Sequence, residues 1–521
     1  MADLLATLPH KISSPLLHWA KASPGAVAVR DHLGNACTYA ELAERVRQAQ
    51  IVLAAHGIGP DARVLLLNEN SVSLVVLILA LSELGAWSVI VNARMSASEI
   101  KRIRDHAEPE AVVYLLDSRA AQQHWQALGD HPDAAGKQLE LNLDLGLQTS
   151  RLGIEINPFA QTRQRDPQSA AVAALIYTTG TTGAPKGVML SHRNILYVAA
   201  VTSKLRGMQA SDRIYAVLPI SHVFGLAAVF LASLYMGAEL VLADRFDPEQ
   251  TMETLRVQGI TGLFGVPAMY ARLLEYATIR QLKPTDMPRL RFMYSGGAPL
   301  DPVIKAKTEE LFGLRLLNAY GMTESGPTIC QVRCDETPDS CTVGRPLPGL
   351  DIKVLGVDGK EVEPGAVGEL HVRGPNIMLG YFRNPEATAA VLDQDGFLNT
   401  GDLVRCDEQG NMHIAGRSKE LIIHSGFNVY PPEVEAVLAK HPDVTLCAVI
   451  GEEHAGNEEV VAFVQRAPGS TLSAQALQEY IKADLAAYKR PGRIVFMEQL
   501  PTAPSGKVLK HRLSARQGAD G

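Results

Sequence analysis

The stretch LIYTTGTTGAPKGVMLSH, residues 175–192, places a flexible loop directly after an apolar run. The run, residues 171–177, is typical of a buried strand. The loop that follows contains three glycines and Lys186. Glycines allow successive backbone N–H groups to point into one concavity, where phosphate oxygens can accept hydrogen bonds from them. Because threonine hydroxyls add donors and the lysine adds positive charge, the stretch indicates a polyphosphate-binding loop.

This loop matches neither of two common phosphate-binding motifs. A Walker loop needs G-x-x-x-x-G-K-[ST], whereas Ala184 and Pro185 here separate Gly183 from Lys186. The spacing also differs from the dinucleotide fingerprint G-x-G-x-x-G. Taken alone, the loop has a second interpretation: a glycine-rich surface turn that binds no ligand.

The length and charge of the chain bound its class. A chain of 521 residues is too long for one hydrophobic core, so two or more domains are expected. The formal net charge of −7 argues against a nucleic-acid partner, which requires an excess of lysine and arginine. Six cysteines make no disulfide framework and we see no secretory leader, so we expect a cytoplasmic protein.

The most apolar segment, residues 71–92, raises the question of a membrane span. A spanning helix needs roughly 20 apolar residues without charges, and Glu83 and Gly85 interrupt this one. The segment instead predicts a buried helix that ends near Leu84, a glycine stop, and a short strand at 88–91. We therefore expect no membrane insertion.

Hydrophobic periodicity predicts an α/β fold. Helical and strand-like stretches alternate over the first 240 or so residues, which is typical of layered, mostly parallel sheets. Residues 342–416 contain short strands and glycine turns, typical of a small β-barrel-like subdomain. Residues 417–521 show a compact α+β pattern of ordinary domain size. We expect a large N-terminal domain, 1–416, and a small C-terminal domain, 417–521.

The run TTGTTGAPKG resembles the phosphate loop of the adenylate-forming superfamily, which includes acyl-CoA synthetases, firefly luciferases and peptide-synthetase adenylation domains. The resemblance extends over nearly the whole chain and is closest to the acyl-CoA synthetase branch. Further motifs of that superfamily follow in order: LPISHVFG around His222, YSGGAPL at 294–300, NAYGMTES at 318–325, TGDL at 400–403, GRSKELIIHSGFNVYPPEVE from 416, and PTAPSGKVLK ending at Lys510.

The resemblance implies an acid–thiol ligase with ATP, Mg²⁺ and coenzyme A. A carboxylate attacks the α-phosphorus of ATP, and a thiol then displaces AMP from the acyl-adenylate. The first step brings two anions together, so it needs cations and fixed donors around the phosphates. The ATP-binding residues implied by the resemblance are Thr178, Thr179, Gly180, Thr181, Thr182, Gly183, Lys186, Gly297, Ala298, Pro299, Asn318, Ala319, Tyr320, Gly321, Met322, Thr323, Asp402, Arg417 and Lys507.

Four residues receive catalytic roles from the resemblance. Lys507 bridges the carboxylate and the α-phosphate, and Thr323 donates to the α-phosphate. Glu324 anchors Mg²⁺, a metal that prefers hard oxygen ligands; the alternative is an acid at a helix N-terminus. His222 forms a gate between the carboxylate and the thiol path, although a lone histidine in an apolar run is more often a core residue.

The resemblance also implies a mobile C-terminal domain that rotates after adenylation. Lys419 occupies the hinge position. The loop HSGFN then approaches the thiol, so Ser425, Gly426 and Phe427 are the expected coenzyme A contacts.

The acyl pocket implied by the resemblance contains His222, Val223, Phe224, Gly265, Gly296 and Ala319. The stretches around these positions carry no Asp, Glu, Lys or Arg. A charged second group on the substrate would be left unpaired there, although a distant arginine could still reach in. Peptide-synthetase domains have an aspartate at the position of Val223, so α-amino acids are disfavoured. An apolar acid is expected, either an aryl or arylpropenoic acid or a medium-to-long fatty acid.

Two other functions remain open at this point. The chain could be an acyl-AMP ligase that loads a carrier protein, or a nucleotide-binding relative without turnover. The expected partners are a small carboxylic acid and coenzyme A, and a homodimer is left open.

Lys507→Ala should abolish adenylate formation from acid and ATP, because the cation that offsets charge at the α-phosphate is lost. Thioester formation from preformed acyl-adenylate should be largely spared. Pyrophosphate release measures the first half-reaction, and coenzyme A consumption with synthetic acyl-adenylate measures the second. Equal loss in both assays would contradict this role for Lys507.

Overall fold

The computed structural model describes residues 6–32, 36–129, 137–144, 149–157, 171–179, 185–283, 289–338, 341–424, 427–454, 457–502 and 508–513. The chain forms two compact units. The first comprises Met1–Asp339, Gly344–Asp351 and Val372–Leu398, and the second comprises Ser340–Val343, Ile352–His371 and Asn399–Gly521.

The first unit contains an eight-stranded sheet in the order β19-β9-β8-β4-β3-β5-β7-β6. Its centre is parallel, from β8 through β4 and β3 to β5, whereas β9 pairs antiparallel with both β8 and β19. The strands are β3 (Arg63–Asn68), β4 (Trp87–Asn92), β5 (Ala111–Leu115), β6 (Lys137–Asp144), β7 (Thr149–Ile156), β8 (Val172–Thr179), β9 (Pro185–Ser191) and β19 (Gly380–Tyr381).

A nine-stranded sheet in the same unit has the order β16-β15-β14-β13-β12-β10-β11-β1-β2. Neighbouring strands run parallel from β14 to β1, as expected for an α/β fold. The strands are β1 (Val27–Arg30), β2 (Ala36–Thr38), β10 (Arg213–Ala216), β11 (Glu239–Leu242), β12 (Gly262–Gly265), β13 (Phe292–Ser295), β14 (Leu316–Gly321), β15 (Thr328–Gln331) and β16 (Arg345–Pro346).

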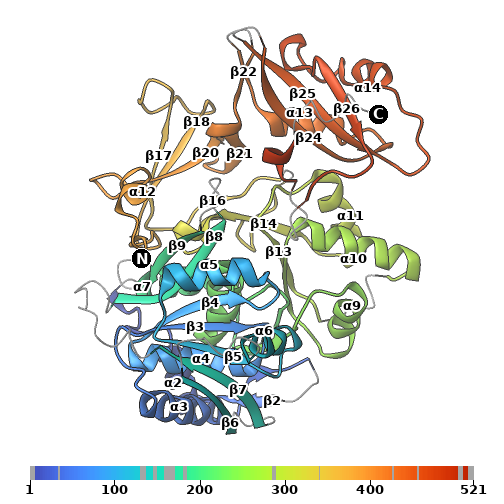
Figure 1. Cartoon of the computed structure of the whole chain (residues 1–521). Helices are drawn as coiled ribbons and strands as arrows, with labels where there is room; N and C mark the ends of the chain where they lie inside the picture. The colour runs from blue at the N-terminus through green and yellow to red at the C-terminus, as the bar shows by residue number, and fades with distance from the viewer. Residues whose placement is uncertain are drawn as a thin grey trace. The chain divides into compact units, whose positions relative to one another are not determined.

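Helices connect these strands, and Figure 1 shows α10 beside α9 and α11. None of the described helices is both long and apolar enough to cross a membrane. The helices of the first unit are α2 (Ser14–Ala22), α3 (Tyr39–Ala55), α4 (Val72–Leu84), α5 (Ala97–Ala107), α6 (Arg119–Gly129), α7 (His192–Leu205), the π-helix η3 (Phe224–Leu231), α8 (Ala232–Met236), α9 (Pro248–Val257), α10 (Pro267–Arg280), α11 (Pro302–Phe312), the short η5 (Thr323–Ser325) and α12 (Pro385–Ala389).

The apolar segment at 71–92 folds as the sequence predicts. Ser71 caps the start of α4, where its hydroxyl accepts a hydrogen bond from the Leu74 N–H at 3.2 Å. Gly85 ends the helix in the left-handed conformation, with a φ of 69°. Most of α4 is buried on all sides, which explains its continuous hydrophobicity without a membrane.

One buried asparagine ties the two sheets of the first unit together. Asn70, between β3 and α4, donates through Nδ2 to the carbonyls of Ala216 and Leu218 at 3.1 and 3.0 Å. Its Oδ1 accepts from the Ile220 N–H at 2.8 Å. These bonds fix the segment that leads from β10 to His222.

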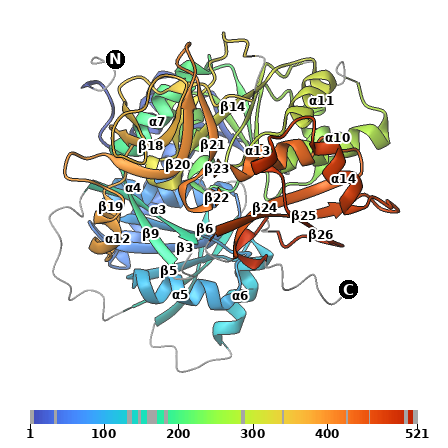
Figure 2. The same ribbon diagram turned by 90° about the horizontal axis from the view of Figure 1, so that it is seen from above.

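The second unit holds a four-stranded sheet and a three-stranded sheet. Figures 1 and 2 show α13 and α14 alongside the three strands, and their buried residues Val434 and Leu477 pack with Val449 and Val464. The elements are β17 (Asp351–Leu355), β18 (Val367–Arg373), β20 (Leu398–Cys406), β21 (Met412–Arg417), η6 (Ser418–Glu420), β22 (Ile422–His424), β23 (Phe427–Val429), α13 (Pro431–Leu438), β24 (Val444–His454), β25 (Asn457–Arg466), α14 (Ala474–Ile481), η7 (Ala487–Lys489), β26 (Arg493–Met497) and η8 (Lys510–Arg512).

The predicted fold class is confirmed: mixed α/β, with mostly parallel sheets in the N-terminal part and an α+β C-terminal part. Within the β-rich stretch expected at 342–416, strands β17, β18, β20 and most of β21 form the four-stranded sheet, whereas β16 and β19 join the two sheets of the first unit. The boundary between the large and the small domain at 416/417 stays a prediction.

Candidate active site

The first cluster of predicted residues lies on the strand pair β8–β9. Thr178 and Thr179 end β8, and Thr178 is the register partner of Lys186 on β9. Lys186 therefore lies on a strand and not in the loop that the sequence predicts. Gly180, Thr181, Thr182 and Gly183 lie outside the described residues, and the Thr179 side chain is likewise not described.

Tyr381 brings this strand pair to a second predicted residue. Its strand, β19, pairs with β9 at Val188, and the neighbouring Phe382 N–H donates to the Gly187 carbonyl at 2.7 Å. The Lys186 Nζ then lies 5.0 Å from the centroid of the Tyr381 ring, a cation–π distance. A π-face leaves the ammonium N–H groups available to an anion.

The hydroxyl of the same tyrosine binds Glu324. Tyr381 Oη donates to Glu324 Oε1 at 2.7 Å, and both side chains are buried. Burial, with the negative charge of Glu324 adding to it, raises the pKa of the Tyr381 hydroxyl, so it remains a donor. The Met378 N–H donates to the Glu324 carbonyl at 2.9 Å and fixes the backbone beside it. One ring thus lies between a cation and a carboxylate.

The donor set suits a magnesium ion that keeps most of its waters. Glu324 offers one hard carboxylate, and no group of three metal-ligating side chains exists in the described part of the chain. Mg²⁺ in nucleotide sites is commonly held by one or two carboxylates plus substrate phosphates. The residues present therefore fit Mg²⁺ delivered with ATP better than a dedicated protein cage.

The motif NAYGMTES forms the end of β14 and the helix η5. Asn318 is buried, Thr323 and Glu324 lie in η5, and Ala319, Tyr320 and Met322 are half-buried. Gly321 has no room for a side chain, because a Cβ there would lie 1.7 Å from the Pro327 carbonyl oxygen. The close backbone contact requires a glycine at this position, independently of any role toward a nucleotide.

The motif YSGGAPL continues from β13. Gly297 adopts a left-handed conformation with a φ of 78°. Gly297 and Pro299 are exposed and Ala298 is half-buried. This turn follows the carboxyl end of β13, where ligands bind in open parallel sheets.

His222 lies just before the π-helix η3. The Phe224 N–H donates to its Nδ1 at 3.3 Å, so a neutral ring carries its proton on Nε2. Solvent reaches the side chain, yet protein surrounds the ring closely enough that desolvation lowers the pKa of His222. Because the imidazole is neutral at neutral pH, it suits the role of a gate and does not provide a fixed positive charge.

The predicted acyl-pocket residues lie at or in η3, β12, β14 and the turn that follows β13. A Cβ at Gly296 would lie 3.1 Å from Phe224 Cε1 and 3.3 Å from the Ala319 carbonyl oxygen, so Gly296, Phe224 and Ala319 meet. Gly265, at the end of β12, lies against Tyr270 in the same way, because a Cβ there would lie 3.0 Å from Tyr270 Cε2. Val223 is fully buried at the start of η3.

Gly225 is required by its own backbone neighbours. A Cβ there would lie 2.2 Å from the Pro219 carbonyl oxygen. Its lack of a side chain therefore allows the π-helix η3 to turn close to residues 218–219. The periodicity of this wholly apolar run gave no indication of a π-helix.

Elsewhere in the first unit, His192 has a structural role. It is buried, and its Nδ1 accepts from the Ile12 N–H at 3.3 Å. Desolvation lowers the pKa of His192 to about 4.

In the second unit, Asp402 and Arg417 lie opposite each other on β20 and β21. Arg417 Nε is 3.0 Å from Asp402 Oδ1, and the aspartate is buried while the arginine is exposed. A cross-strand ion pair of this kind orients the carboxylate. The two residues predicted to contact the ribose thus form an ion pair with each other.

Lys419, the predicted hinge, is an exposed residue within η6. Its neighbour Glu420 pairs with Lys510 at 3.0 Å, and Lys510 also pairs with Glu435 of α13 at 2.8 Å. These two acids raise the pKa of Lys510, although its burial opposes the shift. Lys510 follows Lys507 by three residues in the sequence. Its ion pairs therefore link this C-terminal stretch to the hinge segment.

The predicted coenzyme A loop is only partly described. Phe427 begins β23, is half exposed, and stacks on Tyr488 with 4.7 Å between ring centroids. Ser425 and Gly426 lie outside the described residues, as does Lys507.

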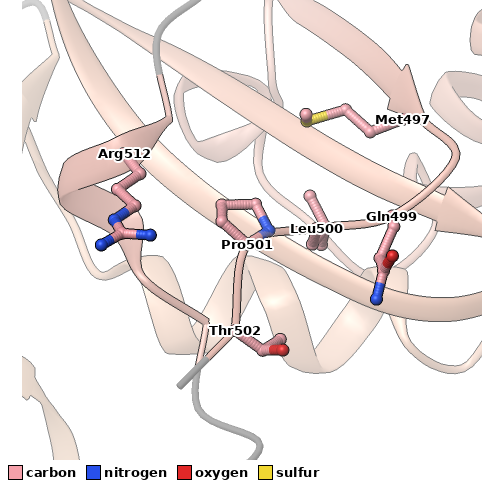
Figure 3. A pocket seen from close by; sticks show the side chains of 6 residues that line it. All are labelled: Met497, Gln499, Leu500, Pro501, Thr502 and Arg512. Carbon is pink, nitrogen blue, oxygen red and sulfur yellow. The ribbon is translucent and has the colours of Figure 1, made fainter. Parts of the chain in front are cut away.

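An open hollow of about 450 Å³ lies in the second unit, and none of the described residues around it is a predicted site residue. Among those described residues Arg512 is the one charged side chain, and Figure 3 shows no carboxylate among the labelled residues. We assign it no part in the chemistry. The hollow is lined by Met497, Gln499, Leu500, Pro501, Thr502 and Arg512.

Three residues that hold the site in place are absent from the sequence-based predictions: Asn70, Tyr381 and Lys510. Each of the three contacts residues that are far away from it in the sequence or that lie next to a motif. The aromatic residue in LGYFRNPE and the lysine at the end of PTAPSGKVLK were the available signals, but neither indicates its partner.

Comparison with known proteins agrees with this geometry. Residues 16–382 match the model of the AMP-binding enzyme family, and residues 433–507 match the AMP-binding enzyme C-terminal domain. A feruloyl-CoA synthase from Amycolatopsis sp is 33% identical over 508 residues, which cover 96% of this chain and 97% of that protein.

Two solved structures share the fold. ATP-bound MatB from Rhodopseudomonas palustris superposes with a TM-score of 0.83 at 31% identity, over 96% of this chain and 97% of that one. An o-succinylbenzoate coenzyme A synthetase (MenE) from Bacillus subtilis, in complex with ATP and magnesium, gives 0.79 at 28% identity, over 96% and 98% of the two chains.

The fold and these relatives define an adenylate-forming ligase. The chain belongs to the AMP-binding enzyme family, in its acyl-CoA synthetase branch. It is an AMP-forming acid–CoA ligase, which uses ATP and coenzyme A with a small carboxylic acid.

Proposed function

We propose that this ligase activates an aryl or arylpropenoic acid as its adenylate and transfers the acyl group to coenzyme A. The contact of Phe224 with Gly296, beside Ala319, carries this proposal. An aromatic ring edge beside a residue without a side chain would suit a flat, apolar acyl group. The feruloyl-CoA synthase relative, whose name denotes an arylpropenoyl group, supports the same class.

The phosphates of ATP would bind between the strand pair β8–β9 and η5. Lys186 neutralises charge on the phosphates, and its position over the Tyr381 ring keeps its N–H donors free for them. Glu324 holds Mg²⁺, oriented by the Tyr381 hydroxyl. When bound, the metal polarises the phosphoryl oxygens as a Lewis acid.

The remaining groups orient the nucleotide and the acid. Asp402, held by Arg417, accepts hydrogen bonds from the ribose hydroxyls. Tyr320 offers its ring to the adenine, and stacking of this type contributes about 1–3 kcal/mol. The neutral His222 ring gates the path from the carboxylate to the thiol. Lys507 completes the charge balance at the α-phosphate, as the family motif implies.

Two alternatives to this function are an acyl-AMP ligase that loads a carrier protein and a relative without turnover. Medium-to-long fatty acids are the alternative substrates. The chain retains Lys186, Glu324, Asp402, Arg417 and Lys507, which argues against loss of turnover.

Tyr381→Phe tests the metal assignment. The variant keeps the ring against Lys186 but removes the hydroxyl that orients Glu324, so the Mg²⁺ concentration for half-maximal ATP binding should rise about tenfold. Titration of a fluorescent ATP analogue with Mg²⁺ measures this. Tyr197→Phe is the matched control, because its buried hydroxyl donates to the Pro348 carbonyl at 2.7 Å, away from Glu324. The same Mg²⁺ requirement in wild type and Tyr381→Phe would contradict the assignment.

A panel of carboxylic acids tests the reaction itself. Pyrophosphate release should be fastest with arylpropenoic acids and at least tenfold slower with decanoic acid. Coenzyme A should be consumed with release of AMP. Release of pyrophosphate without coenzyme A consumption would favour carrier-protein loading, and no release with any acid would favour a binding protein.

A further inference from the structure

A buried asparagine joins the strand that carries Lys186 to the segment that leads to Tyr381. Asn194 lies in the first turn of α7, directly after β9, and is 6% exposed. Its Nδ2 donates to the carbonyls of Pro375 and Ile377, each at 2.8 Å. These two acceptors are 181 and 183 positions away from it in the sequence. One side chain thus holds the segment that runs into β19.

The orientation of the Asn194 amide follows from its partners. Nδ2 faces two carbonyl oxygens, which accept hydrogen bonds and cannot donate them, so the nitrogen must lie on that side. Oδ1 accepts from the Ser191 N–H at 2.9 Å, and the Ser191 hydroxyl accepts from the Asn194 N–H at 3.1 Å. An aspartate of the same shape would supply no donor to the two carbonyls.

The segment held by Asn194 also contacts the backbone of Glu324. The Met378 N–H donates to the Glu324 carbonyl at 2.9 Å. The next N–H along the chain, that of Leu379, donates to the Met189 carbonyl of β9 at 3.0 Å. Within two residues of its contact with Asn194, the segment is therefore anchored both to η5 and to β9.

Three elements meet closely at Gly326, the residue that follows η5. A Cβ there would lie 3.0 Å from the Asn376 carbonyl oxygen and 3.7 Å from Asn194 Cβ. Asn376 is fully buried, and its Nδ2 donates to the Thr328 carbonyl at 3.0 Å. Because the end of η5, the start of α7 and this segment pack together here, a shift of the segment would move the backbone of Glu324.

We infer that Asn194 is a positioning residue for the metal site: by holding residues 375–378, it sets where Glu324 and Tyr381 lie relative to Lys186. The inference rests on the proposed function, in which Glu324 holds Mg²⁺, and it adds a residue that lies outside all the sequence motifs named above. Partners that orient a ligating carboxylate commonly change metal affinity 10–100-fold when they are replaced.

Asn194→Asp tests this inference, because it removes both donors and keeps the shape of the side chain. One carboxylate oxygen would face two carbonyls, so the segment should move away from it. We expect the Mg²⁺ concentration for half-maximal binding of a fluorescent ATP analogue to rise about tenfold. Asn194→Ala withdraws the same donors without burying a charge, and should raise that concentration about threefold. Half-saturation does not depend on the fraction of folded protein, so a merely structural defect leaves it unchanged.

Asn70→Asp is the matched control. Asn70 is 7% exposed and makes the same set of bonds, because its Nδ2 donates to two carbonyls and its Oδ1 accepts one backbone N–H. Its partners lie in the segment that leads to His222 and not beside Glu324. The control should therefore cost similar stability and leave the Mg²⁺ requirement of ATP binding at the wild-type value.

A double variant shows whether Asn194 acts through the metal site. Asn194→Asp combined with Tyr381→Phe should raise the Mg²⁺ requirement by much less than the product of the two single effects, because both changes disturb the same carboxylate. Single effects that multiply would mean that the two residues act independently, and would contradict the inference.

A wild-type Mg²⁺ requirement in both Asn194 variants would overturn the inference, as would an equal rise in Asn70→Asp. Failure of the metal assignment itself is distinguishable, because Tyr381→Phe would then also keep the wild-type requirement. Failure of the proposed acid activation appears as absent pyrophosphate release, and the binding titrations can still be read.

Discussion

The hydrogen bond from Tyr381 to Glu324, with Lys186 over the same ring, is the contact on which the proposed nucleotide site depends. Without it, a buried carboxylate and a nearby lysine would pair directly or separate, and neither arrangement leaves both charges available to a metal–phosphate complex. Tyr381 contacts both the carboxylate and the lysine, so the two charges stay near each other without pairing directly. The short strand β19 enforces this arrangement, because its backbone pairs with β9 immediately after the phosphate-loop segment. Local charge, and not the net charge of the chain, thus prepares the site for an anion.

Much of the fold follows from the sequence because local signals agree with tertiary structure. The helix at Val72–Leu84 has a serine cap, a continuous apolar run and a glycine stop, and each has the expected place. Alternation of short apolar strands with helices predicts parallel sheets, and such sheets form. The motif-bearing residues Phe224, Gly296 and Ala319, far apart in the chain, also meet, and their role in an acyl pocket stays a prediction. Consistency between local and global preferences is what makes such predictions possible.

The parts that sequence could not predict depend on contacts without a periodic signal. Nothing in LGYFRNPE indicates that Tyr381 reaches a glutamate 57 positions earlier in the sequence. The apolar run at 224–231 has no feature that separates a π-helix from an α-helix until the Pro219 carbonyl is seen to occupy the space beside Gly225. Arg206 is the clearest case: a charged residue after a helix is normally solvated, yet it is buried in the interior of the first unit.

The central claim is that Glu324 binds the metal of a metal–ATP complex whose phosphates Lys186 contacts. A crystal structure with ATP and Mn²⁺, located by its anomalous scattering, tests this most directly. The account predicts a manganese peak at direct coordination distance, about 2 Å, from a Glu324 oxygen, with Lys186 Nζ in hydrogen-bond contact with the β- or γ-phosphate. A manganese ion bound through phosphates alone, with Glu324 turned away from it, would contradict the account.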